Sequence, residues 1–268
     1  MGFVPEPTQL GNRLTFATMT DHVHALSFGA AAAAYDQNRP TYPVDAVTWA
    51  AGGPPPRRVV DLGAGTGKLT RVLLSAGYDA VPVEPDPKMR ARLADATPGT
   101  TALAGSAETV PLPDGGADAV VAGQAYHWFD PERAHPEIAR LLRPGGTFAA
   151  IWNRRDDSVP WVAELTVITH DQPAVHGGFD PGDELSFGDT YFGPVERAEF
   201  HHSTTQTPES LVALVATRSY YLVATPEHRA EIDAAVRRLC AEHPALAGRE
   251  TFELPFQTFA YKAQVLRS

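Results

Sequence analysis

The sequence predicts an α/β fold of the doubly wound type, in which a mostly parallel sheet is covered by helices on both faces. Apolar runs of strand length alternate with stretches of helical spacing from residue 58 to residue 152. The runs are short and apolar, as expected for parallel strands that are buried on both faces. A glycine loop joins the first run to the helix that follows it. Such alternation indicates βα units that together build one parallel sheet.

Local residue types justify each element in turn. Pro43 can occupy the first position of a helix over residues 43–51. Asp130–Glu132 supplies an N-cap, a proline and an acid, which opens a helix that runs to about residue 142. Pro82 weakens the second strand, because proline donates no ladder hydrogen bond. The five expected strands are 58–62, 80–84, 101–104, 117–122 and 147–152, and the other expected helices are 24–37, 68–75 and 87–96.

The C-terminal part departs from this alternation. Residues 195–203 and 251–265 have strand character, and the region from 208 to about 243 between them is helical. We expect two last strands in the sheet, one of them antiparallel, with the intervening helices forming a cap over the site. The expected division is an N-terminal extension at 1–20, a core at 21–155 and 190–268 whose residues 21–45 form a lid, and cap regions at 156–189 and 207–245.

Composition excludes several classes of function. The chain of 268 residues has a net charge of −10, and its 22 basic residues are scattered rather than clustered, which disfavours a nucleic-acid partner. The sequence shows no signal peptide and no apolar stretch long enough to cross a membrane, so we expect a cytoplasmic protein. A single cysteine, Cys240, fits a reducing compartment. Without a spaced cluster of His, Asp or Glu residues, we expect no metal site.

The glycine loop at residues 63–67 follows Asp61 directly after the first strand. A phosphate-binding P-loop requires Gly-Lys-Ser/Thr, but Lys68 is followed by Leu69. A dinucleotide loop requires Gly-x-Gly-x-x-Gly, and here the third glycine comes one residue early. A loop that holds S-adenosylmethionine has this spacing and an acid in the strand, where the acid attracts the ammonium of the ligand.

Glu84 adds a second acid at the end of the second strand. It lies 23 residues after Asp61, where a carboxylate can accept hydrogen bonds from ribose hydroxyls. This role suits NAD as well, so Glu84 predicts a nucleoside ligand without distinguishing the two. An NAD-dependent oxidoreductase therefore stays open at this point, although no constellation for hydride transfer is recognisable.

Beyond these two acids, residues 28–155 resemble the class I S-adenosylmethionine-dependent methyltransferases. Residues 83–89 resemble the second motif of that family, and residues 105–108 with Leu112–Pro113 resemble the third. Residues 34–43 resemble the lid of bacterial members similar to trans-aconitate methyltransferase. The resemblance implies a seven-stranded sheet with a reversed last hairpin, S-adenosylmethionine as cofactor and S-adenosylhomocysteine as product. The implied cofactor residues are Tyr35, Arg39, Asp61, Gly63, Ala64, Gly65, Thr66, Gly67, Glu84, Pro85, Met89, Ser106, Ala107, Glu108, Gln124 and Ala125.

The segment 124–129 after the fourth strand is expected to face the transferred methyl group. His127 is the candidate general base, because its solution pKa is near neutrality; the alternative is that it only packs or shapes the loop. The segment lacks the Asn/Asp-Pro-Pro-Tyr/Phe motif of many methyltransferases that act on DNA bases or on amide and amine nitrogens. Together with the net negative charge of the chain, this absence points to a small-molecule acceptor. Methylation of an oxygen or a carboxyl group is favoured over transfer to N or C. The candidate substrate residues are Tyr126, His127, Trp128, Trp152, Asn153 and Tyr220.

Two further alternatives remain at the level of sequence. The same fold supports proteins that bind S-adenosylmethionine for another reaction or for sensing, since a fold does not fix the chemistry. Methylation of RNA or protein would require a basic surface or an extra binding module, and neither is found in the sequence. The oligomeric state is not predicted.

Overall fold

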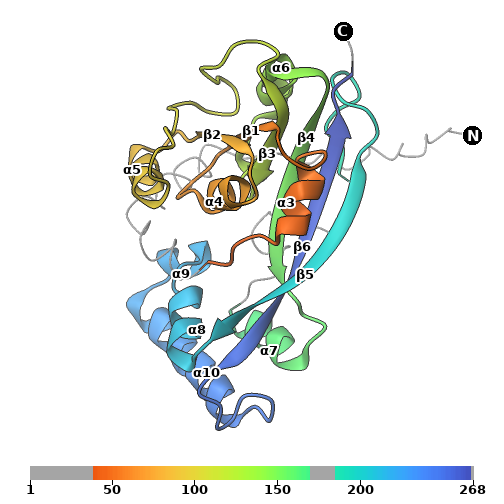
Figure 1. Ribbon diagram of the computed structural model, residues 1–268. Coiled ribbons are helices and arrows are strands. Elements are labelled where there is room, and N and C mark those ends of the chain that lie inside the picture. The colour runs from red at the N-terminus through yellow and green to blue at the C-terminus, as the bar shows by residue number, and fades with distance from the viewer. Residues whose placement is uncertain (1–38, 170–184, 267–268) are drawn as a thin grey trace, which may run out of the picture.

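The computed structural model describes residues 39–169 and 185–266. The predicted extension 1–20, the helix 24–37, the lid residues before Arg39 and residues 170–184 of the first cap region lie outside the described residues. Within them, helices surround one mixed sheet, as Figure 1 shows. The doubly wound α/β fold predicted from the sequence is confirmed.

The sheet has the strand order β2-β1-β3-β4-β6-β5. Strands β2, β1, β3 and β4 are parallel, whereas β6 runs antiparallel to both of its neighbours. The reversed last hairpin is therefore confirmed. The strands are β1 (Arg58–Leu62), β2 (Asp79–Val83), β3 (Ala117–Gly123), β4 (Leu142–Arg155), β5 (Glu196–Gln206) and β6 (Phe252–Gln264).

The prediction of a third strand over residues 101–104, and with it a seven-stranded sheet, is wrong. Only one parallel bridge joins Leu103 to Val83. The Leu103 amide donates to the Pro82 carbonyl and the Glu84 amide donates to the Leu103 carbonyl. The next bond of a parallel ladder would come from the amide of residue 82 toward Thr101, and proline has no such donor. Pro82 leaves β2 intact but stops the pairing on its outer side, so the described sheet has six strands.

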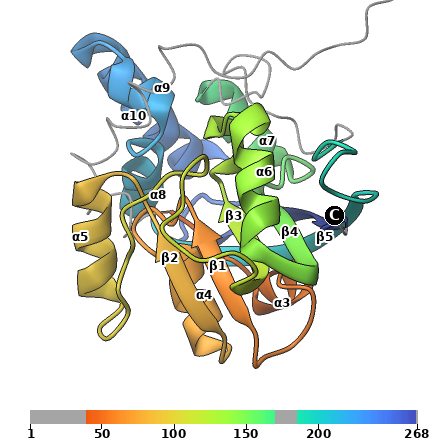
Figure 2. The same ribbon diagram turned by 90° about the horizontal axis from the view of Figure 1, so that it is seen from above.

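Helices cover the two faces of the sheet, as the view from above in Figure 2 shows. Helices α3 and α4 pack on one face, and α6 packs on the other. The helix starts follow the sequence: Asp86 and Asp130 cap α5 and α6 through their side chains, and each of these helices begins with proline. The bounds are α3 (Val44–Ala50), α4 (Lys68–Ser75), α5 (Pro87–Ala96) and α6 (Pro131–Leu141).

The C-terminal helices form a separate unit around the ends of the long strands. Its apolar core contains Trp161, Val236 and Phe252, from three different elements. The single helical region expected from 208 to 243 is divided into three helices, and a fourth precedes the gap in the described chain. These helices are α7 (Pro160–Ile168), α8 (Pro208–Val215), α9 (Ser219–Val223) and α10 (Pro226–Glu242). In the described ranges, none of the helices is long and apolar enough to cross a membrane.

Candidate active site

The glycine loop lies at the carboxyl end of β1, and its backbone explains its residue types. Gly63, Gly65 and Gly67 all have positive φ angles, of 73°, 58° and 83°, which favour glycine. A Cβ atom on Gly63 would lie 2.7 Å from that of Ala125, and one on Gly67 would lie 2.8 Å from Leu93. Nothing lies within 4 Å of the Cβ position of Gly65. Two glycines therefore permit close packing, whereas Gly65 borders open space.

The amides of this loop are used inside the protein. Gly63 and Ala64 both donate to the Val83 carbonyl, and Gly65 donates to Oε2 of Glu84 at 2.8 Å. The Gly67 amide donates to the Ala64 carbonyl. A loop that binds pyrophosphate presents such amides to its ligand. With four amides already bonded, this loop suits a nucleoside ligand without phosphate better than a dinucleotide.

Asp61 is a buried carboxyl group with one unsatisfied oxygen. Its exposed fraction is 1%, Oδ2 accepts a hydrogen bond from the Thr70 hydroxyl at 2.5 Å, and Oδ1 has no partner. Burial, reinforced by the nearby charge of Glu84, raises the pKa of Asp61 to about 7. Because a buried acceptor without a partner is costly, Oδ1 is suited to a donor supplied by a ligand.

Glu84 lies at the end of β2 beside this loop. Its oxygens accept from the amides of Gly65 and Asp86, both at 2.8 Å, and burial raises its pKa. These bonds fix the carboxylate and leave each oxygen with a second lone pair. Two buried carboxyl groups, one of them with an unsatisfied oxygen, thus lie beside the glycine loop. This donor set fits S-adenosylmethionine, which carries an ammonium and two ribose hydroxyls.

The loop after β3 has a strained backbone. Gln124 has a φ of 55°, the one positive φ found for a residue other than glycine in the described chain. Its side chain donates to the Asn153 carbonyl at 2.9 Å. The side-chain Nδ2 of Asn153 donates to the Thr41 carbonyl, and its Oδ1 accepts from the Thr258 hydroxyl at 2.6 Å. These bonds join β3, β4 and β6 to the segment before α3, and strain of this kind is frequent at functional sites.

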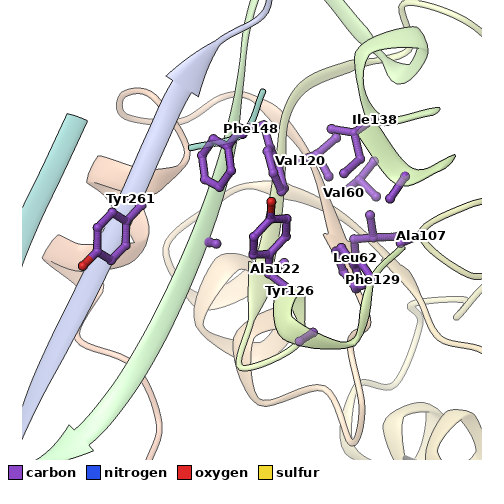
Figure 3. Packing of buried hydrophobic residues seen from close by; sticks show 14 of the residues in the cluster. Val60, Leu62, Ala107, Val120, Ala122, Tyr126, Phe129, Ile138, Phe148 and Tyr261 are labelled. Atoms are coloured by element: carbon purple, nitrogen blue, oxygen red, sulfur yellow. The ribbon is translucent and has the colours of Figure 1, made fainter. Parts of the chain in front are cut away.

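Tyr126 points into the core and not toward solvent. It is 2% exposed, and its hydroxyl group lies 2.9 Å from Nε2 of His135. The rings of Phe129 and Phe148 pack against it at 5.8 and 5.6 Å, as Figure 3 shows. Burial raises the pKa of the Tyr126 hydroxyl and lowers that of His135. The structure therefore places Tyr126 beneath the loop, where it supports the neighbouring residues of the candidate substrate set.

His127 and Trp152 lie together. Trp152, in β4, donates from Nε1 to Nδ1 of His127 at 3.4 Å. Trp152 is 6% exposed, whereas His127 and Trp128 are half-buried in the short helix η2 (Tyr126–Trp128). The ring of His127 packs against that of Trp128 at 4.7 Å. The predicted substrate residues of β4 and of the segment after β3 are thus brought to one place.

Other predicted residues are more scattered. The guanidinium of Arg39 donates to Oγ1 and to the carbonyl oxygen of Thr217, just after α8. Tyr220 lies in α9, and Tyr35 lies outside the described residues. Glu108 accepts from the Asp130 amide. The remaining members are placed as follows: Met89, Ala107 and Thr66 are buried, Ser106 is half-buried and pairs with Thr109, and Pro85 is exposed.

Four threonines of this site were not predicted from the sequence. Thr70 bonds Asp61, Thr258 and Thr41 bond Asn153, and Thr217 bonds Arg39. Thr70 had a usable signal, since it lies in the first turn of the helix that follows the loop. The pair Thr217–Arg39 is separated by 178 residues, and no local pattern predicts such a contact. Within the described ranges, no group of three or more His, Cys, Asp or Glu side chains could hold a metal ion.

Comparison with known proteins agrees with this geometry. Residues 60–150 match the family model described as a methyltransferase domain. The chain is 43% identical over 240 residues to an uncharacterized methyltransferase of Mycobacterium tuberculosis, covering 89% of this chain and 96% of that protein. It is also 35% identical over 134 residues to the malonyl-[acyl-carrier protein] O-methyltransferase of Methylococcus capsulatus, covering 46% of this chain and 49% of that one.

A solved structure shares the fold. It is that of a candidate type II methyltransferase from Anaeromyxobacter dehalogenans, with a TM-score of 0.59 and 24% identity over 85% of this chain and 96% of that chain. At this identity the likeness concerns the fold alone. The sequence relationship to the mycobacterial protein spans nearly its whole length, and the glycine loop and both acids stand where the fold requires them. The chain therefore belongs to the class I S-adenosylmethionine-dependent methyltransferases.

Proposed function

We propose that this enzyme uses S-adenosylmethionine to methylate a small molecule in the cytoplasm, with an oxygen atom as the acceptor. The observation that carries the cofactor assignment is the unsatisfied Oδ1 of buried Asp61 beside the fixed carboxylate of Glu84. When bound, the cofactor supplies a methyl group already activated by a positively charged sulfur. The protein therefore has to bind, orient and exclude water, and alignment alone is worth about 7–11 kcal/mol.

Each cofactor residue has a defined task in this proposal. Asp61 would accept a hydrogen bond from the cofactor ammonium, which also compensates the buried charge. Glu84 would accept from the ribose hydroxyls while its two amide bonds hold it in place. The open space at Gly65 lets a ligand approach the backbone. The turn at Ser106–Thr109 and the buried Ala107 would border the adenine.

The charge of the chain supports a small acceptor. A net charge of −10 disfavours RNA and DNA. The name of the Methylococcus relative, an O-methyltransferase, supports oxygen as the acceptor atom.

A tritium-transfer experiment tests this proposal. The enzyme is incubated with methyl-labelled S-adenosylmethionine and a bacterial extract that has been separated into small molecules, protein and RNA. We expect label in the small-molecule fraction only, with one S-adenosylhomocysteine formed per methyl group transferred. Label in protein or RNA would contradict the small-molecule assignment, and binding of S-adenosylhomocysteine without transfer to any fraction would contradict catalysis.

A further inference from the structure

The segment 105–114 contains no helix and no strand. Its regular pairing is limited to one isolated antiparallel bridge, between Ser106 and Thr109. The segment follows Leu103, whose carbonyl oxygen accepts the Glu84 amide at 3.0 Å. It therefore leaves the edge of the sheet directly beside the acid that we expect to hold the ribose. A backbone without a strand or helix has to find its hydrogen-bond partners elsewhere in the protein.

Helix α6 supplies these partners. Oε1 of Glu137 accepts the Val110 amide at 2.7 Å. The Arg140 guanidinium donates to the carbonyl oxygens of Val110 and Leu112, at 3.2 and 2.9 Å. It also donates to Asp114 at 2.6 Å and to both oxygens of Glu137, at 2.7 and 2.8 Å. Because a guanidinium presents its donors in a fixed fork, the pair Glu137–Arg140 determines where this part of the segment lies.

The pair is ionised and half-buried. Only 16% of the Glu137 side chain and 30% of the Arg140 side chain are exposed. The hydrogen bond from Arg140 lowers the pKa of Glu137, and the bonds to Glu137 and Asp114 raise the pKa of Arg140. Hydrogen bonds between charged groups are stronger than those between neutral groups. The two side chains therefore form a firm support for the backbone that they contact.

Close packing connects the segment to the end of β2. A Cβ atom on Gly105 would lie 3.1 Å from Cγ1 of Val83, the last residue of that strand. Ala107 is buried in the same apolar cluster as Val83. Near the start of α6, the Asp130 amide donates to Oε1 of Glu108 at 3.0 Å. Helix α6 thus holds the segment at several points while the segment packs against β2.

We infer that Glu137 and Arg140 are positioning residues that give the cofactor site its preference for the adenine base. This inference rests on the proposed placement of the adenine beside Ser106–Thr109. The two side chains act through the backbone of Val110 and Leu112, which they hold in place. When the segment is loosened, a ligand first has to order it, and the apparent affinity falls by the fraction of molecules in which the segment is in place.

Two ligands separate the base from the rest of the cofactor. S-adenosylhomocysteine contains adenine, whereas S-ribosylhomocysteine has the same homocysteine and ribose but a hydroxyl group in place of the base. Binding of both to the full chain is measured by ligand-observed nuclear magnetic resonance, which also detects weak binding. In Arg140→Met, we expect S-adenosylhomocysteine to bind about tenfold more weakly than in the parent, as when the segment is in place in about a tenth of the molecules. Binding of S-ribosylhomocysteine should change by less than about twofold.

Glu137 provides a graded version of the same test. Glu137→Gln keeps an oxygen that can accept the Val110 amide, whereas Glu137→Ala loses it. We expect the alanine variant to lose more affinity for S-adenosylhomocysteine than the glutamine variant, and neither to lose affinity for S-ribosylhomocysteine. Circular dichroism shows whether each variant is folded, and the two Glu137 variants provide the comparison if Arg140→Met does not fold.

Arg58→Met serves as the matched control. Arg58 forms an ion pair with Asp79 at 3.7 Å, at the amino ends of β1 and β2 and therefore at the opposite edge of the sheet from the glycine loop. This variant also removes one arginine and its ion pair, but it leaves the segment 105–114 untouched. We expect it to bind both ligands as the parent does.

The outcomes are distinct from those that test the proposed function. Equal losses for both ligands, or unchanged binding of S-adenosylhomocysteine in every folded variant, would overturn the positioning role and leave methyl transfer to a small molecule intact. A parent that binds S-ribosylhomocysteine as tightly as S-adenosylhomocysteine would also overturn it, because the base would then not be recognised. Since binding is measured without turnover, a failure of the tritium transfer would not affect this result.

Discussion

Replacing Asp61 by asparagine is expected to stabilise the protein without cofactor and to weaken binding of S-adenosylhomocysteine. Burial is the main cause of the raised pKa of Asp61, which goes from 3.8 to about 7, and Glu84 adds to it. At about 1.4 kcal/mol per pKa unit, holding the ionised group in the folded chain costs about 4 kcal/mol. Asparagine reproduces the neutral acid and removes this cost.

The sign of the pH dependence follows from the direction of the shift. Between about pH 4 and pH 7 the folded Asp61 keeps a proton that the unfolded chain has lost, so stability falls as pH rises through this window. Above about pH 7 the full loss of folding stability caused by ionising Asp61 is reached. At about pH 5.5 this loss is only about 2 kcal/mol. The advantage of Asp61→Asn should therefore be about twice as large at about pH 8 as at about pH 5.5.

Urea unfolding at both pH values, with and without S-adenosylhomocysteine, provides the assay. The ligand should stabilise the parent more than the variant, because the ammonium has lost its negatively charged acceptor. Asp95→Asn, at an exposed position on α5, removes the same charge without burial and serves as the control. A variant that is no more stable than the parent at mildly alkaline pH, or that binds the ligand equally well, would refute the role assigned to Asp61.

Three other outcomes follow from the same geometry. Gly65→Ala should cost about 1 kcal/mol of stability because of its positive φ, and calorimetric titration should show weaker ligand binding. The control Gly248→Ala has a φ of 75° and equally open surroundings, so it should lose a similar stability but leave ligand binding unchanged. Tyr126→Phe should lower the unfolding free energy by about 1–3 kcal/mol, because buried His135 loses its partner, and should leave ligand affinity unchanged; a selective loss of affinity would place Tyr126 in the pocket. Binding of S-adenosylhomocysteine just below neutral pH should release a proton from Asp61, visible as a dependence of the binding heat on the buffer; binding without proton release would contradict its raised pKa.

Local patterns predicted the parts of this fold that depend on local physics. Asp130 caps α6 as predicted, because a short acidic side chain reaches the first free amides, and α5 begins at Pro87 as predicted. The glycine loop was readable because positive φ angles restrict the residue type. The failed strand at residues 101–104 shows the limit: the missing donor is Pro82 in a neighbouring segment, and strand pairing depends on both partners.

In the candidate site, too, the residues set by local sequence were predicted, whereas contacts between distant parts of the chain were not. Asp61 was predicted because it lies in the first strand just before the glycine loop, and Glu84 because it follows the neighbouring strand β2. Tyr126 was expected in the substrate pocket, but its neighbours Phe148 and His135 come from other elements and turn the ring inward. The bond between His127 and Trp152 joins side chains 25 residues apart, and only the folded strand β4 brings them together.

Pro82 also affects how the folded protein meets other copies of itself. A sheet edge with a free row of amides and carbonyls is a template on which another chain can add a strand, and long edges of this kind promote aggregation. At the β2 edge, the missing amide of Pro82 interrupts that row, and Leu103 occupies the carbonyl of Pro82. The residue that limits the sheet to six described strands thus also protects this edge against growth from outside.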